Sequence, residues 1–169
     1  QNDASNSQGN NTLSQRYDDP YFVQNITRAT NAGMLAGPYH FARLDIIAST
    51  QNSGGVANTG TDEANHFLQM AGAWMRPGYL LPVFDLESGS DARNRAQITQ
   101  FSIDFSNRIY EATGVRPIMY INGNYAANLV QSPIEDYFPV LWVARYHNQD
   151  NPNSIPVQTM HPKESYNGF

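Results

Sequence analysis

The chain has 169 residues, which suits one domain with a single core, and its 40% hydrophobic and 15% charged residues are typical of a globular protein. The formal net charge of −5 argues against non-specific binding to nucleic acid, and the absence of cysteine excludes disulfides and thiolate chemistry. No apolar run approaches the roughly 20 residues of a membrane span, and the start at Gln1 indicates a processed chain or part of a longer one.

Helices and strands alternate along the chain after a polar N-terminal segment, residues 1–17. Asp18, Asp19 and Pro20 indicate a helix start, and Gly33 indicates a helix stop. The predicted helices span residues 20–32, 61–76, 92–113 and 124–130, and the predicted strands span residues 34–43, 80–87, 116–122 and 139–147. The alternation predicts parallel strands with right-handed crossovers in one domain over residues 18–147, followed by a loop-rich C-terminal part over 148–169.

The strand at residues 80–87 ends in two carboxylates, Asp85 and Glu87. Its apolar residues predict a strand covered on both faces, as in a parallel sheet flanked by helices. Because successive side chains of a strand alternate between its faces, Asp85 and Glu87 point to the same side. Two neighbouring acids raise each other's pKa, which is unfavourable unless function needs it. This pair is therefore the first candidate for a catalytic site.

The other predicted strands also end in polar or aromatic residues. The residues at the four strand ends are Tyr39 and His40, Asp85 and Glu87, Tyr120 and Asn122, and Trp142 and Tyr146. No glycine-rich phosphate-binding turn follows any strand, which argues against a nucleotide-binding fold. The pattern predicts an α/β fold of the TIM-like (β/α) barrel type, in which active sites are built from the carboxyl ends of the strands.

Two carboxylates surrounded by aromatic and amide side chains fit the hydrolysis of carbohydrates. Aromatic rings stack on sugar rings, and amides and phenols bind the hydroxyl groups. One acid must be protonated near neutral pH to donate to the leaving oxygen, and a neighbouring carboxylate raises its pKa toward that range. One acid and one ionised partner is the division of roles found in glycosidases.

Six blocks of the sequence resemble the glycoside hydrolase family 25 lysozymes, the Chalaropsis-type N-acetylmuramidases. The blocks are residues 19–22 (DPYF) with Asn25, 37–42 (GPYHFA), 63–64 (EA) with Phe67, 81–87 (LPVFDLE), 114–120 (GVRPIMY) and 141–146 (LWVARY). They follow the family order over about residues 18–147. The resemblance implies a β/α barrel that cleaves the β-1,4 bond between N-acetylmuramic acid and N-acetylglucosamine in peptidoglycan.

The same resemblance implies residue roles. Glu87 is expected to be the general acid, with Asp85 assisting. The expected substrate-binding residues are Tyr39, His40, Tyr120, Asn122, Trp142 and Tyr146. No metal or organic cofactor is implied. The expected partner is the glycan strand of peptidoglycan, bound by a monomer that is secreted or released by a phage and acts outside the cell or at the cell wall.

The sequence also departs from the family pattern. The family's first strand with its Asp, its second strand with a Glu-Gly turn, and its late strands with Trp-Gln and a further Asp have no clear counterparts here. We therefore expect an incomplete barrel in this chain. Two alternatives follow: a non-catalytic barrel that binds glycan or cell wall, and a related glycosidase acting on another N-acetylated polysaccharide.

Several candidate residues have structural interpretations as well. Asp85 and Glu87 could be an acid pair held by backbone amides or by Arg, and His40 could be a hydrogen-bonded histidine of the barrel wall. Tyr120 and Trp142 could belong to the core. The remaining histidines, His66, His147 and His161, lack metal-ligand spacing and are expected to be surface or structural residues.

Overall fold

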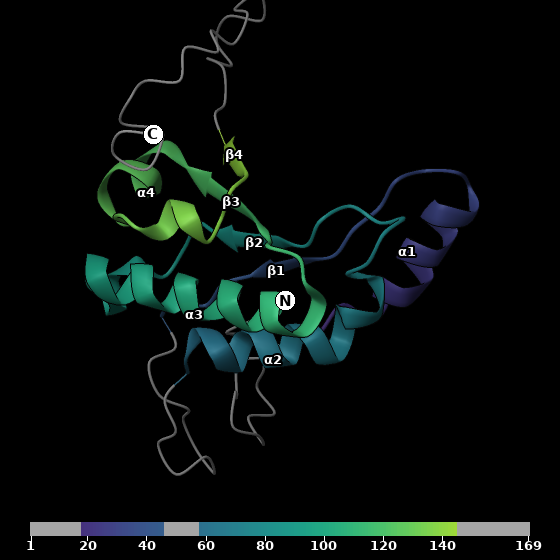
Figure 1. Cartoon of the computed structure of the whole chain (residues 1–169), viewed down its shortest axis with the longest axis horizontal. Coiled ribbons are helices and arrows are strands. Elements are labelled where there is room, and N and C mark those ends of the chain that lie inside the picture. The colour runs from purple at the N-terminus through teal and green to yellow at the C-terminus, as the bar shows by residue number, and fades with distance from the viewer. Residues whose placement is uncertain (1–17, 46–57, 145–169) are drawn as a thin grey trace, which may run out of the picture.

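The structure of the protein, a computed structural model, describes residues 18–45 and 58–144 (Figure 1). The helices are α1 (Phe22–Asn31), α2 (Gly60–Ala71), α3 (Arg95–Thr113) and α4 (Gly123–Asn128), and the strands are β1 (Tyr39–Phe41), β2 (Val83–Leu86), β3 (Ile118–Asn122) and β4 (Leu141–Ala144). Short 3-10 turns lie at Gly72–Trp74, Ser90–Ala92 and Ile134–Asp136. Each predicted helix and strand is present, and the strands are shorter than predicted.

The four strands form one parallel sheet in the order β1-β2-β3-β4. Chain order equals spatial order, as expected when each crossover places the next strand beside the last. The described residues therefore form an open sheet of four strands rather than a closed barrel. The predicted α/β class and parallel strands are confirmed, and a complete barrel is not.

Local capping explains where the two long helices begin. The Thr59 hydroxyl accepts a hydrogen bond from the Asp62 amide at 3.1 Å, and the Asp62 carboxylate accepts one from the Thr59 amide at 2.9 Å. Asn94 and Gln97 form the same reciprocal pair at the start of α3, with both distances 2.9 Å. Such a capping box satisfies two amides that lack helical partners. Helix α3 therefore begins at Arg95, later than predicted. Helix α2 ends at Ala71, earlier than predicted.

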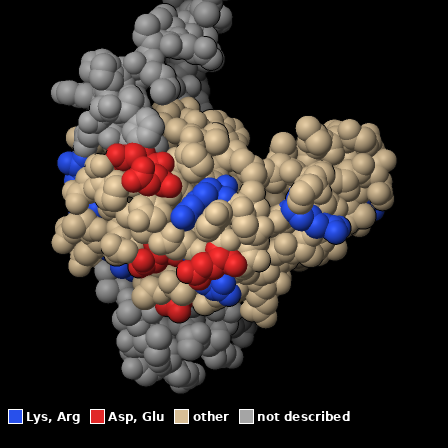
Figure 2. Space-filling model, in the orientation of Figure 1, with Lys and Arg blue, Asp and Glu red and all other residues tan. Residues whose placement is uncertain are grey.

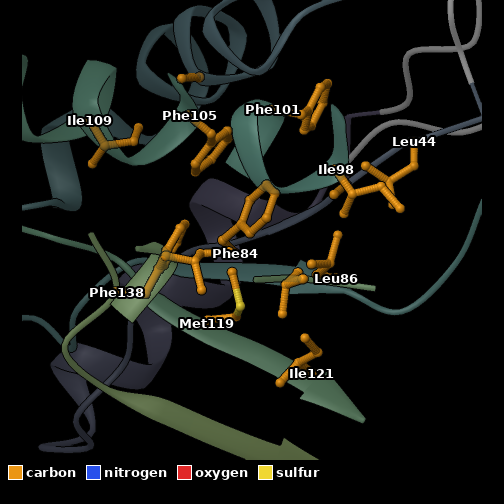
Figure 3. Packing of buried hydrophobic residues seen from close by; sticks show 14 of the residues in the cluster. Leu44, Phe84, Leu86, Ile98, Phe101, Phe105, Ile109, Met119, Ile121 and Phe138 are labelled. Carbon is orange, nitrogen blue, oxygen red and sulfur yellow. The ribbon is translucent and has the colours of Figure 1, made fainter. Parts of the chain in front are cut away.

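The core lies between one face of the sheet and helices α2 and α3, which pack side by side (Figure 1). Phe84 lies at its centre, with its ring centroid 4.4 Å from that of Phe105 in α3 and 5.5 Å from that of Phe138 (Figure 3). Met119 and Ile121 of β3 belong to the same cluster. Burial of these large apolar side chains is the main stabilising contribution to the fold.

Among the described residues, nothing comparable covers the opposite face of the sheet. The expectation that the strand at 80–87 is covered on both faces is thus wrong for this part of the chain. Leu80 and Leu81 are 48% and 37% exposed, and Val83 is only partly buried. The apolar run suggested burial on both faces because it combines two kinds of residue. Leu80 and Leu81 precede the strand and are exposed, whereas other apolar side chains of the run face the core. We call the uncovered side of β1 to β4 the open face.

Candidate active site

The open face carries a row of side chains that the sheet register brings together. Asp85 of β2 is paired with Tyr120 of β3, and Tyr120 is paired with Trp142 of β4. Because facing residues in register point to the same side of a sheet, the three side chains lie on one surface. Their neighbours Phe84, Leu86 and Met119 point to the core. Strand alternation thus separates the chemical groups from the packing groups.

A groove of about 430 Å³ lies on the open face. Its lining residues are Gly37, Tyr39, Leu80, Leu81, Val83, Asp85, Glu87, Tyr120 and Trp142. Tyr39 is 52% exposed and Trp142 is 57% exposed, so both aromatic rings are available to a ligand. The Tyr120 and Trp142 rings meet edge to face, with centroids 5.1 Å apart. A groove with two acids and three aromatic rings can bind a sugar chain by stacking and hydrogen bonds.

The electrostatics of the groove are dominated by Asp85 and Glu87. Partial burial, and then the negative charge of Glu87, raise the pKa of Asp85 to about 7. Asp85 Oδ1 is buried and has no hydrogen-bond partner among the residues that the structure describes. Burial also raises the pKa of Tyr39, with further contributions from Asp85, Asp19 and Glu87. Asp85 can therefore hold a proton close to neutral pH, which makes this strand end a candidate for acid catalysis.

A family comparison decides the class of protein. The sequence pattern of the glycosyl hydrolases family 25 matches residues 8–164, which is most of the chain. This chain belongs to glycosyl hydrolases family 25. The resemblance inferred from the six sequence blocks is confirmed.

Relatives of this family 25 chain include named lysozymes. Lysozyme M1 of Streptomyces globisporus is 39% identical over 72 residues, which are 42% of this chain and 21% of that protein. The structure of a family GH25 lysozyme from Aspergillus fumigatus superposes with a TM-score of 0.65 at 28% identity, covering 82% of this chain and 64% of the other. The bacterial lysozyme from Streptomyces coelicolor superposes with a TM-score of 0.64 at 25% identity, covering 79% and 60%. The chain spans less than two thirds of each of these relatives.

Five of the predicted site residues of this family 25 chain line the groove, namely Tyr39, Asp85, Glu87, Tyr120 and Trp142. Asn122 is not among the residues that line the groove. Its side-chain oxygen accepts a hydrogen bond from the Tyr125 amide at 3.0 Å and caps α4. Tyr146 lies outside the described residues.

His40 lies apart from the groove, contrary to its prediction as a substrate-binding residue. It is fully buried, and its ring centroid lies 5.2 Å from that of Phe105 in α3. Its Nε2 lies 2.6 Å from Glu63 Oε2 in a hydrogen bond. Burial lowers the pKa of His40, and Glu63 opposes this shift. His40 alternates with Tyr39 along β1, so it points to the core; the alternative of a hydrogen-bonded wall histidine describes its position.

Glu63, which belongs to the family block at residues 63–64, lies away from the groove and has a structural position. The structure places its carboxylate at the centre of a buried polar cluster. It accepts hydrogen bonds from Asn58 Nδ2 at 2.7 Å and from the Arg43 amide at 3.2 Å, besides its bond to His40. An acid among apolar residues on the inner side of a predicted helix was the available signal, since a buried carboxylate needs partners.

His66 has a structural position, in agreement with its prediction. It is buried, and its Nε2 lies 2.5 Å from Asp18 Oδ1, linking α2 to the segment before α1. Within residues 18–45 and 58–144, no three His, Asp or Glu side chains are grouped in a way that could hold a metal ion. No helix in these ranges is long and apolar enough to cross a membrane. On the face shown in Figure 2, charged side chains of both signs are scattered among uncharged ones.

Proposed function

We propose that this chain is a peptidoglycan hydrolase that cleaves the β-1,4 bond between N-acetylmuramic acid and N-acetylglucosamine. The observation that carries the proposal is the presence of Asp85 and Glu87 together in an aromatic groove on the open face of a family 25 chain. The relatives named lysozymes support the same substrate class. Because the chain spans only part of their length, activity is an expectation for experiment.

We assign Glu87 as the general acid and Asp85 as its partner. Glu87 is exposed at the rim of the groove, where a glycosidic oxygen can approach it, whereas Asp85 is half-buried. Burial and the negative charge of Glu87 raise the pKa of Asp85 to about 7, so this carboxyl retains a proton near neutral pH. We propose that Glu87 delivers a proton to the glycosidic oxygen and that the two carboxylates then stabilise the positive charge on the reacting sugar.

Cleavage of one glycosidic bond needs a proton for the leaving oxygen and a water molecule for C1. The Glu87 proton passes to the oxygen that links the sugars while the bond from that oxygen to C1 of N-acetylmuramic acid breaks. Positive charge develops at C1, and the ionised Asp85 stabilises it or orients the 2-acetamido group. Water then supplies the hydroxyl at C1, and its second proton returns to a carboxylate. The products are a reducing N-acetylmuramic acid and a free 4-hydroxyl on N-acetylglucosamine.

The aromatic residues of the groove are proposed to bind the sugar rings. Tyr39 lies on β1, Tyr120 on β3 and Trp142 on β4, so the three rings flank the acids of β2 on both sides. Stacking of a sugar on exposed aromatic surface supplies affinity without a charge. We propose that the protein acts as a monomer outside the cell or at the cell wall, where this substrate lies.

The test is wall clearance by the full 169-residue chain and by its Glu87→Gln variant. The wild type is expected to clear purified bacterial walls, and the variant to lose about 10²- to 10⁴-fold in rate because Gln cannot donate the proton. Glu111→Gln, on the exposed surface of α3, is the matched control and is expected to clear walls normally. Mass spectrometry of the products should show reducing N-acetylmuramic acid. Wild-type rates in Glu87→Gln would contradict the assignment.

A non-catalytic glycan-binding module is the second candidate, and the open face of the sheet favours it. The groove is bounded by a single sheet of four strands among the described residues, so its second wall is not described. In this case wild type and Glu87→Gln sediment equally with walls and neither clears them. A hydrolase for another N-acetylated polysaccharide would instead clear chitin and leave purified peptidoglycan intact.

A further inference from the structure

The loop that follows β2 carries Glu87 and leads into α3 through Arg93. Glu87 lies after the last residue of β2, Leu86, so strand pairing alone does not fix it. The loop contains Gly89 with a φ of 77° and the short turn Ser90–Ala92. The position of the proposed acid therefore depends on what holds this loop.

Arg93 attaches the loop to a second part of the chain. Its Nε donates to the carbonyl oxygen of Leu44 at 2.9 Å, and its Nη2 donates to the carbonyl oxygen of Asn58 at 2.7 Å. Its guanidinium lies 4.8 Å from the centroid of the Phe101 ring. Burial lowers the pKa of Arg93, and the charges of Glu63 and Asp45 oppose that shift. The planar guanidinium can bind two carbonyls at once, which an ammonium group cannot do with the same geometry.

The surface that receives the loop is itself held by buried hydrogen bonds. We call residues 42–45, Asn58 and Glu63 the platform. Glu63 binds the Arg43 amide and Asn58 Nδ2, and the Arg43 side chain binds the Asp45 carboxylate through Nε at 2.7 Å. The loop meets the platform closely: a Cβ on Gly89 would lie 2.7 Å from the Asp45 amide nitrogen. Only glycine fits there, on account of both space and φ.

The platform is also joined to Asp85. The Ala42 amide donates to the Asp85 carbonyl oxygen at 2.9 Å. Asp85 and the loop after it are therefore both attached to the platform. Asp85 is attached through the strand pairing, and the loop is attached through Arg93 and Gly89. A shift of the loop on the platform would change the separation of the two carboxyls.

We propose that Arg93 is a positioning residue that fixes the Glu87 loop on the platform and so sets the placement of Glu87 relative to Asp85 and a bound glycan. The inference rests on the proposed function of Glu87. Arg93 lines no part of the groove and acts through the loop. Its removal is expected to lower the turnover number more than the affinity for walls, since a small misplacement of a reacting group can cost up to about 10²-fold.

The experiment compares Arg93→Met and Arg93→Lys with the control Arg95→Met in the full chain. Arg95 is also part-buried and donates to a carbonyl oxygen, that of Val130 at 2.7 Å, but away from the platform. Each variant is assayed for kcat and KM on soluble peptidoglycan, for thermal unfolding, and for the titration of Asp85 by carboxyl ¹³C NMR. Because the charge of Glu87 contributes to the raised pKa of Asp85, this titration reports how close Glu87 lies to Asp85 and does not depend on catalysis.

Arg93→Met is expected to lose about 10- to 100-fold in kcat with little change in KM. The pKa of Asp85 is expected to fall from about 7, because Glu87 spends less time beside it. Arg93→Lys should retain part of both properties, and Arg95→Met should retain both fully. If Arg93→Met does not fold, the Lys variant decides: a lowered kcat and a lowered Asp85 pKa in a folded protein support the proposal.

Folded Arg93 variants with a wild-type kcat and a wild-type Asp85 titration would overturn the inference. If wild type hydrolyses no wall while the Asp85 titration still depends on Arg93, the proposed function fails and the positioning role stands. If wild type is active and both titration and kcat are insensitive to Arg93, the positioning role fails and the proposed function stands.

Discussion

The two faces of the sheet use the same strands for opposite purposes. On the covered face, Phe84 and Met119 are fully buried and belong to the core. On the open face, Asp85 and Tyr120, their direct neighbours in sequence, line the groove. Packing needs apolar side chains that exclude water, whereas an acid needs a place where partial burial shifts its pKa without removing access for a ligand. Alternation along a strand provides both within two residues.

Two acids among the described residues, the fully buried Glu63 and the half-buried Asp85, sharpen this comparison. Glu63 on the covered side is fully buried and has hydrogen bonds from His40, Asn58 and the Arg43 amide. Asp85 on the open side is only half-buried, and one of its oxygens has no partner among the residues described. A carboxylate with several donors serves the structure, and a carboxylate without them is free to exchange a proton.

The largest expected effect on stability comes from the covered face. Phe84→Ala should lower the free energy of unfolding by about 3–5 kcal/mol, because it removes a ring at the centre of the core and leaves a cavity. Tyr120→Ala on the open face is the matched variant, and it should cost about 1 kcal/mol or less while weakening binding to walls. Urea unfolding and wall sedimentation measure the two properties. Equal loss of stability in both variants would contradict the division between the faces.

A smaller effect is expected at the buried cluster. Glu63→Leu should lower the free energy of unfolding by about 2–4 kcal/mol, because it leaves the Asn58 amide, the His40 ring nitrogen and the Arg43 amide without their acceptor. Glu63→Gln keeps one acceptor oxygen and should cost less. The exposed Glu111→Gln is the control and should unfold like wild type. A Glu63→Leu protein as stable as wild type would show that the cluster is dispensable for the fold.

The smallest expected effect is a pH dependence caused by Asp85. Its pKa in the folded protein, about 7, lies above the 3.8 of an ordinary aspartate, so folding favours its protonated form. Its stabilising contribution is therefore fully present below about pH 4 and is lost as the pH rises toward 7. Asp85→Asn should unfold like wild type at pH 4 and be more stable by about 1 kcal/mol at pH 8, after allowance for solvent screening. A difference that is the same at both pH values would rule out the shifted pKa.

Several parts of the fold and site were predictable from local pattern. The glycine stops and the order of four helices and four strands follow from residue preferences over short windows. The sequence placed Tyr39, Asp85, Glu87, Tyr120 and Trp142 on or directly after predicted strands, and the alternation of side chains along a strand brings all five to the groove. The ordered blocks identified the family, because their combination and order are specific although each block alone is weak.

Other features required the tertiary structure. His40 and Tyr39 are adjacent at one strand end, and composition does not say which of them faces the groove; the register of β1 on β2 decides this. Asn122 belongs to a strand end but caps α4 instead. Glu63 and Arg93 carry roles through contacts with residues far away in sequence, which no local pattern contains.

The sequence by itself determined the family, the parallel α/β class and the acidic pair, because these depend on residue type and on short spacings. The tertiary structure alone decided which face of the sheet is covered, which acid is held by donors and which arginine supports the Glu87 loop. These depend on long-range packing, where a side chain's hydration and hydrogen-bond partners are set by distant segments. The carboxylates of Glu63 and Asp85 are chemically alike, and only their surroundings differ. Glu63 accepts buried hydrogen bonds that hold the fold, whereas burial and the charge of Glu87 raise the pKa of Asp85 so that it binds a proton near neutral pH.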